Sequence, residues 1–226
     1  MSFMRLFKSI AILPLWRKAD IETIGTEDQW GVLKDSLTRD SFIVSAGVGK
    51  NITFEQSIVR KFRATIILLD PSPTGVDTMS RIGTEGGYLD FRPLGLAAQT
   101  GSLDFGRPDV ESEGSFKKGS PNDGIKLDCV SLQHLLDTEK RTHIDLLKLD
   151  VEGFEYEILL SALRDKIEID QICVEIHTNR AITIDETIFS ALWLIIRLRL
   201  AGYAIVYNDK MDFTFVHKRL LLNNAA

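Results

Sequence analysis

The sequence predicts one α/β domain with a mainly parallel sheet, helices on both of its faces and an antiparallel hairpin at the C-terminal end. Three observations carry this prediction. Apolar, β-branched runs alternate with helical patterns along most of the 226 residues, which is typical of βαβ units. A glycine-containing turn at residues 46–49 joins an early strand to a helix. Near the end, Asn208-Asp209-Lys210 separates two short apolar runs, as a hairpin turn would.

The composition permits a single sizeable core and argues against a nucleic-acid partner. Hydrophobic residues make up 44% of the chain and charged residues 26%, which is ordinary for a globular domain. Because the formal net charge is −5, we expect no binding to a nucleic-acid backbone. The two cysteines, Cys129 and Cys173, lie among apolar residues and form no CxxC pair. We therefore expect buried, reduced thiols and no zinc–thiolate site.

The first 16 residues mix apolar side chains with Arg5 and Lys8, but Pro14 and Trp16 stand where a signal peptide needs small residues. The longest apolar run elsewhere, Phe189–Ile196, is far shorter than the roughly 20 residues that cross a bilayer. We expect a docking or frayed N-terminal helix, a cytoplasmic location and no stable membrane insertion; a transient membrane contact stays open. The chain then divides into an N-terminal segment with a leading helix over residues 1–38, a main domain over 39–218 and a tail over 219–226.

The N-terminal half of the main domain predicts two strand–helix units. Phe54, Ile58 and Phe62 recur at helical spacing. Pro71 and Pro73 stop the second strand and open a turn before the next helix. In chain order, with the leading helix first, the pattern predicts helix Glu27–Leu37, strand Ser41–Ser45, helix Ile52–Phe62, strand Thr65–Asp70 and helix Thr74–Ile82.

The C-terminal half continues the alternation after a long loop. Residues Gly106–Gly124 are rich in Gly, Ser, Pro, Asp and Lys, and predict a mobile loop, either a lid over a substrate site or a plain surface insertion. Ser131 is a natural N-cap for the helix after it. The predicted elements are strand or bent strand pair Tyr88–Arg92 and Leu94–Ala98, strand Ile125–Val130, helix Ser131–Thr138, strand His143–Leu149, helix Phe154–Leu163, strand Ile169–Ile176, helix Asp185–Ala201, and hairpin strands Ala204–Tyr207 and Phe213–His217.

The turn after the first strand predicts a ligand-binding loop. Gly47 and Gly49 allow a close approach of the backbone to a ligand, and the following helix directs free N–H groups toward the same crevice. Asp70 ends the next strand about twenty residues on, where a carboxylate can accept hydrogen bonds from a ribose diol. A structural turn and a solvated aspartate before proline are the alternatives. Together these residues favour a nucleoside-containing cofactor, without choosing between NAD and S-adenosylmethionine.

Four longer segments carry sequence motifs: Val44–Glu55, Leu69–Pro73, Ile144–Glu155 and Val174–His177. The third motif is the most specific, because it combines an apolar strand with Asp-Val-Glu-Gly and a second glutamate. On these segments the chain resembles the FkbM family of methyltransferases, from about Trp30 to Val216. The resemblance implies a Rossmann-like class I methyltransferase fold with a seven-stranded sheet. It also implies S-adenosylmethionine as cofactor and a hydroxyl of a sugar, glycan or secondary metabolite as acceptor. Cofactor contacts are expected from Ser45, Gly47, Gly49, Asn51, Asp70, Pro71 and Asp150.

The residues at two strand ends predict the catalytic groups. Asp150 ends the central strand, where a carboxylate can contact the cofactor, orient an acceptor hydroxyl or accept its proton; capping a helix is the alternative. Glu175 and His177 share one face of their strand. An imidazole titrates near neutrality and suits a general base, with a structural histidine as the alternative. Glu152 lies nearer the strand end than Glu155, although both suit a first helical turn. We expect His177, Asp150, Glu152 and Glu175 to be catalytic, with His177 or Asp150 as the base.

The same strand ends raise the question of a metal. Asp150, Glu175 and His177 are residue types that could together hold a divalent ion. Nothing in their spacing demands one, so no metal is predicted. The sequence also leaves the oligomeric state open.

Two other functions compete with a methyltransferase. An NAD-dependent oxidoreductase is disfavoured by the terminal hairpin and by Ile52-Thr53, which occupy the place of the third glycine of a dinucleotide fingerprint. A non-catalytic binding or scaffold protein gains slight support from Ser45 and Lys50. Class I methyltransferases often carry an acidic residue in place of Ser45, although relatives in the resembled family also carry serine there, and relatives often show an acidic pair in place of Lys50-Asn51. The retained acidic and histidine residues argue against a scaffold protein: Asp70, Asp150, Glu152 and His177.

Overall fold

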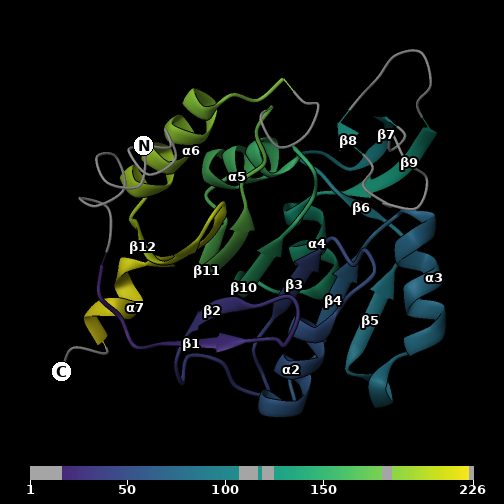
Figure 1. Cartoon of the computed structure of the whole chain (residues 1–226), viewed down its shortest axis with the longest axis horizontal. Coiled ribbons are helices and arrows are strands. Elements are labelled where there is room, and N and C mark those ends of the chain that lie inside the picture. The colour runs from purple at the N-terminus through teal and green to yellow at the C-terminus, as the bar shows by residue number, and fades with distance from the viewer. Residues whose placement is uncertain (1–16, 107–116, 119–124, 180–184, 224–226) are drawn as a thin grey trace.

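A central seven-stranded sheet organises the computed structural model, which describes residues 17–106, 117–118, 125–179 and 185–223 (Figure 1). The predicted N-terminal docking helix and most of the predicted loop at 106–124 lie outside these residues. The sheet has the order β12-β13-β11-β10-β3-β4-β5. Its strands are β3 (Ile43–Ala46), β4 (Ile66–Leu69), β5 (Leu89–Arg92), β10 (His143–Leu149), β11 (Glu168–Glu175), β12 (Tyr203–Asp209) and β13 (Asp212–His217).

Only β13 runs antiparallel to its neighbours in this sheet. If β13 is set aside, the other six strands follow the doubly wound order 3-2-1-4-5-6, in which the chain moves outward from the middle in both directions. The seven-stranded Rossmann-like class I methyltransferase fold and its antiparallel hairpin strand are thereby confirmed. All four residues of β3 and of β4 are buried; β4 is accordingly a continuous apolar run, and β3 is apolar except for Ser45.

Helices cover both faces of the sheet, and neighbouring strand residues face opposite cores. Val44 and Leu147 pack with α4, α5 and α6 in one core, whereas Ile43 and Leu146 pack with α2 and α3 in the other. No helix among the described residues is long and apolar enough to cross a membrane. The helices are α2 (Thr53–Phe62), α3 (Pro73–Ile82), the 3-10 turn η3 (Glu85–Gly87), α4 (Leu132–Glu139), α5 (Glu155–Arg164), α6 (Ile188–Leu200) and α7 (Lys218–Asn223).

The predicted leading helix over Glu27–Leu37 is wrong. This segment contains β2 (Trp30–Leu33), which pairs with β1 (Ile21–Ile24) as an antiparallel hairpin. All four residues of β2 are buried. The side chains of the sheet also fix its backbone, since Thr214 donates to the Gly31 carbonyl at 2.6 Å and Gln171 accepts from the Leu33 N–H at 2.8 Å. Tertiary contacts with the main sheet therefore decide the conformation of this segment.

A second, four-stranded sheet was also not foreseen. It has the order β6-β9-β7-β8 and stands beyond the end of α3 in Figure 1. The described part of the predicted C-terminal tail is likewise ordered as α7, whose Leu220 and Leu221 pack against Val206 and Val216. The strands of the small sheet are β6 (Gly95–Leu96), β7 (Gly101–Gly106), β8 (Lys117–Lys118) and β9 (Ile125–Val130).

Candidate active site

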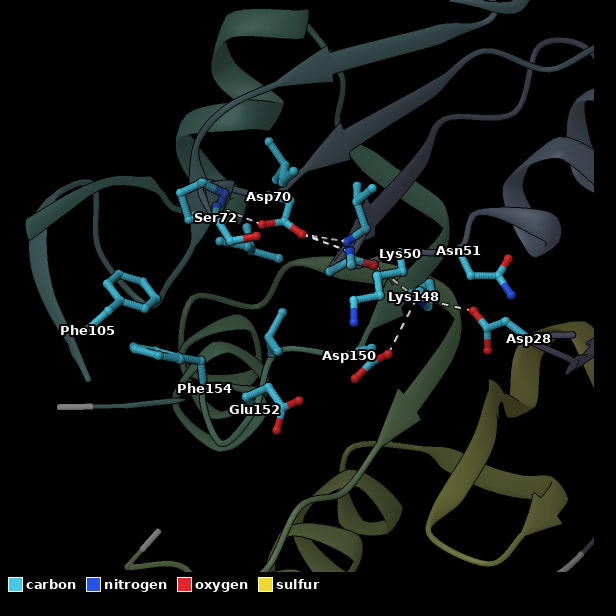
Figure 2. A pocket seen from close by; sticks show the side chains of 18 residues that line it. Asp28, Lys50, Asn51, Asp70, Ser72, Phe105, Lys148, Asp150, Glu152 and Phe154 are labelled. Carbon is cyan, nitrogen blue, oxygen red and sulfur yellow. Dashed lines mark hydrogen bonds and ion pairs between the residues drawn. The ribbon is translucent and has the colours of Figure 1, made fainter. Parts of the chain in front are cut away.

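A cavity of about 240 Å³ opens where the carboxyl ends of β3, β4 and β10 meet (Figure 2). From β3 the chain continues to β4 on one side, whereas β10 pairs with the other side of β3. Ligands of open α/β sheets bind at such a reversal of strand order. The cavity is lined by residues of the glycine turn, of the segment after β4, of the segment after β10 and of the β1–β2 hairpin.

The glycine turn brings the backbone of two strands into close contact. Gly47 has φ +91°, and a Cβ at this position would lie 1.9 Å from the carbonyl oxygen of Asp150. Gly49 has φ +53°, and a Cβ there would meet nothing within 4 Å. Gly47 is thus required for the packing of the turn on the end of β10, while the space beside Gly49 stays open.

Asp70 holds this turn in place. Its Oδ2 accepts hydrogen bonds from the N–H groups of Val48 at 3.0 Å and Gly49 at 2.9 Å, and its Oδ1 accepts from Ser72 N–H at 2.8 Å. A carboxylate offers about four acceptor positions, so about one is left for a ligand. The structure brings Asp70 to the cavity wall as predicted, and it adds a role in shaping the loop that the sequence did not reveal.

Lys148 forms the floor of the cavity and was missed by sequence reasoning. Its side chain is 1% exposed, and its Nζ donates to the Gly47 carbonyl at 3.1 Å. The same Nζ lies 3.5 Å from Asp28, 3.8 Å from Asp150 and 3.9 Å from Glu55. Burial by itself would lower the pKa of Lys148, but the surrounding carboxylates raise it above its usual value. The residue is therefore a buried ammonium ion.

The two ends of the cavity differ in chemistry, as Figure 2 shows. At one end Phe105 and Phe154 stack at 4.7 Å between ring centroids, near Leu96. At the other end the lining side chains are charged or polar: Asp28, Lys50, Asn51, Lys148 and Asp150. A ligand with an aromatic ring at one end and charged groups at the other would match this division of the lining residues.

A tight turn after β10 presents Glu152 to the cavity. Glu152 has φ +49° and Gly153 φ +104°, so the chain reverses here in a conformation that a glutamate rarely adopts. Glu155 fixes this turn from beneath, because its carboxylate accepts from Gly153 N–H at 2.8 Å and from His177 N–H at 2.7 Å. Glu155 is fully buried. It ties the end of β10 to the residue that follows β11.

His177 lies beside this turn among four carboxylates. Its Nε2 is 3.4 Å from Glu152, 3.8 Å from Glu175 and 4.0 Å from Asp150, and its Nδ1 is 3.4 Å from Glu155. Burial would lower the pKa of His177, but these carboxylates outweigh it and raise the pKa to about 10. Burial, with the charge of Asp150, raises the pKa of Glu175 to about 7. The four carboxylates around His177 therefore concentrate negative charge beside the turn after β10.

The structure brings most of the predicted site residues together. Glu175 and His177 do not line the cavity; they contact it through Asp150 and Glu152. Ser45 lies beneath the turn, 1% exposed, and donates to Glu55 at 2.5 Å. The predicted site residues that line the cavity are Gly47, Gly49, Asn51, Asp70, Pro71, Asp150 and Glu152.

Comparison with known proteins identifies the family. Residues 38–205 match the family described as Methyltransferase FkbM domain. The chain belongs to this family. It is 24% identical over 167 residues to the hexuronic acid methyltransferase AglP of Haloferax volcanii, which covers 73% of this chain and 67% of that protein. The predicted relationship is confirmed, and the chain is a methyltransferase.

Solved structures with a similar chain course include two proteins of low sequence identity. One is the fibrillarin pre-rRNA processing protein of Methanococcus jannaschii, with a TM-score of 0.46, 13% identity and coverage of 88% of this chain and 83% of that one. The other is M. capricolum TrmK in complex with S-adenosylhomocysteine, with a TM-score of 0.38, 11% identity and coverage of 80% and 62%.

Membership in the FkbM methyltransferase family implies S-adenosylmethionine, rather than NAD, as the cofactor. The cavity has the chemistry that this cofactor requires. Its aromatic end suits an adenine ring, and its charged end holds both signs, as the zwitterionic amino-acid end of the molecule needs. A Cβ at Gly49 would meet no atom within 4 Å, so the backbone is open to the cavity at this position.

Proposed function

We propose that this methyltransferase transfers the methyl group of S-adenosylmethionine to a hydroxyl group of a sugar, with hexuronic acids as the first class to test. The observation that carries the proposal is the group of carboxylates and His177 directly beside the cofactor cavity. Sugar hydroxyls are donors that such carboxylates can bind and orient. The name of the relative from Haloferax volcanii supports a hexuronic acid as acceptor.

The cofactor would be held by the residues that shape and line the cavity. Gly49 and Asn51 border its charged end, together with Lys50 and Asp28, which offer one charge of each sign to the amino-acid end. The remaining acceptor position of Asp70 would bind a ribose hydroxyl, and Pro71 would contact the nucleoside. Ser45 would act indirectly, through its hydrogen bond to Glu55 beneath the turn. When bound, S-adenosylmethionine supplies a methyl group already activated by its positive sulfur.

The protein must orient the acceptor oxygen and remove its proton. Of the four expected catalytic residues, Asp150 and Glu152 line the cavity, whereas His177 is 6% exposed and lies behind them. The Oε2 of Glu152 is buried and has no hydrogen-bond partner among the described residues. We therefore assign proton removal to Glu152, and positioning of the acceptor to Asp150, Glu175 and His177. This replaces the expectation that His177 or Asp150 is the base.

Titration calorimetry with S-adenosylhomocysteine, and with NAD as the control ligand, tests the cofactor assignment. We expect binding of the former only. Asp70→Ala should weaken it by about 10-fold or more, because three backbone N–H groups lose their acceptor and the turn loosens. A folded protein that binds neither ligand would contradict the assignment and favour a non-catalytic scaffold.

Methyl transfer to hexuronic acid glycosides, with neutral hexose glycosides beside them, tests the acceptor. A hexuronic acid offers hydroxyls and a carboxylate, so the product distinguishes the two reactions: a methyl ether survives mild alkali and a methyl ester does not. We expect an ether, with turnover lowered about 100-fold in Glu152→Gln and affinity for S-adenosylhomocysteine unchanged. An alkali-labile product would overturn the hydroxyl assignment.

A further inference from the structure

Three of the residues beside the cavity have the arrangement of metal ligands. One donor atom each of Asp150, Glu175 and His177 lies within 4.8 Å of the other two. An ion at the centre of such a triangle is at most about 2.8 Å from each atom, and a small side-chain rotation brings this to the 2.0–2.6 Å of common divalent ions. The separations of 3.8 Å and 4.0 Å from His177 Nε2 are too long for hydrogen bonds. They leave room for an ion between the groups.

His177 is oriented as a metal-binding histidine is. Its side chain is 6% exposed, and its Nδ1 makes no well-formed hydrogen bond among the described residues. Its Nδ1 faces the fully buried Glu155 at 3.4 Å, which leaves Nε2 directed at the carboxylates. Metal-binding histidines usually have a carboxylate behind the other ring nitrogen, which fixes the ring. Glu155 in turn is held by two backbone N–H groups.

The charges in the neighbourhood favour a cation. The imidazole of His177 is surrounded by four carboxylates, those of Asp150, Glu152, Glu155 and Glu175. The charge of Asp212 also contributes to the raised pKa of Glu175. Lys148 approaches only Oδ2 of Asp150, at 3.8 Å, whereas Oδ1 faces His177. A bound divalent ion would balance this surplus of negative charge, which is fully buried at Glu155 and partly exposed at the other carboxylates.

We propose that Asp150, Glu175 and His177 bind a divalent metal ion that accepts mixed nitrogen and oxygen ligands, for which Mn²⁺ is the probe. The inference rests on the proposed function, because the ion would also coordinate the acceptor oxygen and make its hydroxyl more acidic. The acceptor oxygen gains the methyl group and loses its proton to Glu152, which is not among the three ligands. The cofactor leaves as the neutral thioether, and the metal ion keeps its charge.

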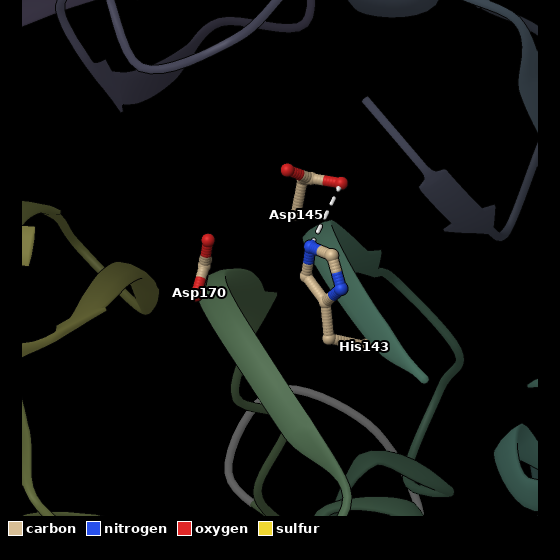
Figure 3. A group of neighbouring side chains, drawn as sticks. All are labelled: His143, Asp145 and Asp170. Carbon is tan, nitrogen blue, oxygen red and sulfur yellow. Dashed lines mark ion pairs between the residues drawn. The ribbon is translucent and has the colours of Figure 1, made fainter. Parts of the chain in front are cut away.

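The chain offers a matched control on the same two strands. His143, Asp145 and Asp170 also lie within 4.8 Å of one another, at the amino ends of β10 and β11 (Figure 3). Here the fold supplies partners itself: Asp145 accepts from Phe42 N–H at 2.7 Å, and Asp170 pairs with Arg219. We propose no metal site at this second cluster.

The experiment is a titration of the metal-free full-length chain with Mn²⁺, followed by the electron paramagnetic resonance of the free ion. Calorimetry with S-adenosylhomocysteine is run on the same samples. We expect one bound Mn²⁺ per chain, with affinity lowered at least about 10-fold in Glu175→Gln and His177→Gln and unchanged in His143→Gln. Circular dichroism checks the fold of each variant. Glu175 is partly exposed, so its variant decides the matter if His177→Gln fails to fold.

The outcomes separate the metal from the methyltransferase proposal. Failure of the wild-type chain to take up Mn²⁺ at millimolar concentration, or uptake that Glu175→Gln leaves unchanged, overturns the metal site, whereas S-adenosylhomocysteine binding and methyl transfer stand or fall on their own. Loss of Mn²⁺ binding in Glu175→Gln alongside intact binding in His143→Gln supports the metal site, even where no sugar is methylated.

Discussion

At each end of the strand pair β10–β11, one histidine and two carboxylates lie within 4.8 Å of one another, and the two groups differ in what surrounds them. At the amino end, Asp170 is paired with Arg219, and the side chain of His143 is 43% exposed. At the carboxyl end, His177 is 6% exposed, and no arginine approaches its carboxylate neighbours within the described residues. The same residue types are thus neutralised by the fold at one end and left with an excess of negative charge at the other.

The difference indicates that the end of the strand, more than the residue types, decides whether such a group lies beside a cavity. Loops after the carboxyl ends of parallel strands surround an open crevice, because the chain order reverses there. At the amino ends, α7 returns over β13 and brings Arg219 to Asp170. A donor set that faces a crevice keeps its binding capacity, whereas one covered by the chain is saturated.

The largest effect is expected from substitution of Lys148, the buried cation near the carboxyl end of β10. Lys148→Met removes a buried ammonium and leaves Glu55 and Asp28 without it, so we expect a loss of about 3–5 kcal/mol in the free energy of unfolding. Binding of S-adenosylhomocysteine should be lost as well, because Lys148 also holds the Gly47 carbonyl. Denaturant unfolding and calorimetry measure the two effects. A loss of less than about 1 kcal/mol, as for a surface ion pair, would show that the buried cluster is not a structural support.

The next largest effect is expected on turnover, when His177 and His143 are substituted in turn. His177→Gln should lower turnover about 100-fold, because the acceptor loses its positioning group, and should leave affinity for S-adenosylhomocysteine within about twofold. His143→Gln should change neither, since it lies at the opposite end of the same strands. Steady-state kinetics with the methylated sugar as product measure both. An equal loss of turnover in the two variants would mean that the substitutions act by disturbing the sheet, and not by removing a group from the site.

Much of the fold was predictable because buried parallel strands form apolar runs, as Leu146–Leu149 does around its one lysine. The β1–β2 hairpin was not, because the four buried residues of β2 show no alternation of apolar and polar side chains. Asp150, Glu175 and His177 could be proposed from their places at strand ends. The role of Glu155 could not, because its contact with His177 joins residues 22 positions apart. A charged residue inside a buried strand was the available signal for Lys148, since such a charge requires partners.

Two buried tyrosines, one at each end of β11, allow a further test of the difference between the two strand ends. Tyr156 donates to the His177 carbonyl at 2.6 Å at the carboxyl end, and Tyr203 donates to the Ile169 carbonyl at 2.8 Å at the amino end of β11. Each Tyr→Phe change removes one buried hydrogen bond and should cost about 1 kcal/mol of unfolding free energy. Only Tyr156→Phe should also lower turnover, because it loosens the backbone that carries His177. Unfolding curves and kinetics on both variants separate support of the fold from support of the site; a turnover loss in Tyr203→Phe would contradict the distinction.

The smallest effect on stability comes from Arg219→Met, which is also the most direct test of why the amino-end cluster is saturated. The Arg219 side chain is 36% exposed, so losing its ion pair with Asp170 should cost at most about 1 kcal/mol of unfolding free energy. Without this cation, the remaining differences from the carboxyl-end set include the hydrogen bond that Asp145 accepts from Phe42 N–H and the greater exposure of His143. If Arg219 is what saturates the amino-end cluster, the variant should take up a second, weaker Mn²⁺ in the resonance titration. If uptake stays at one ion per chain, the buried frame behind His177 makes the difference. Glu155 fixes that ring, whereas His143 is 43% exposed and has Asp145 as its one ion-pair partner among the described residues.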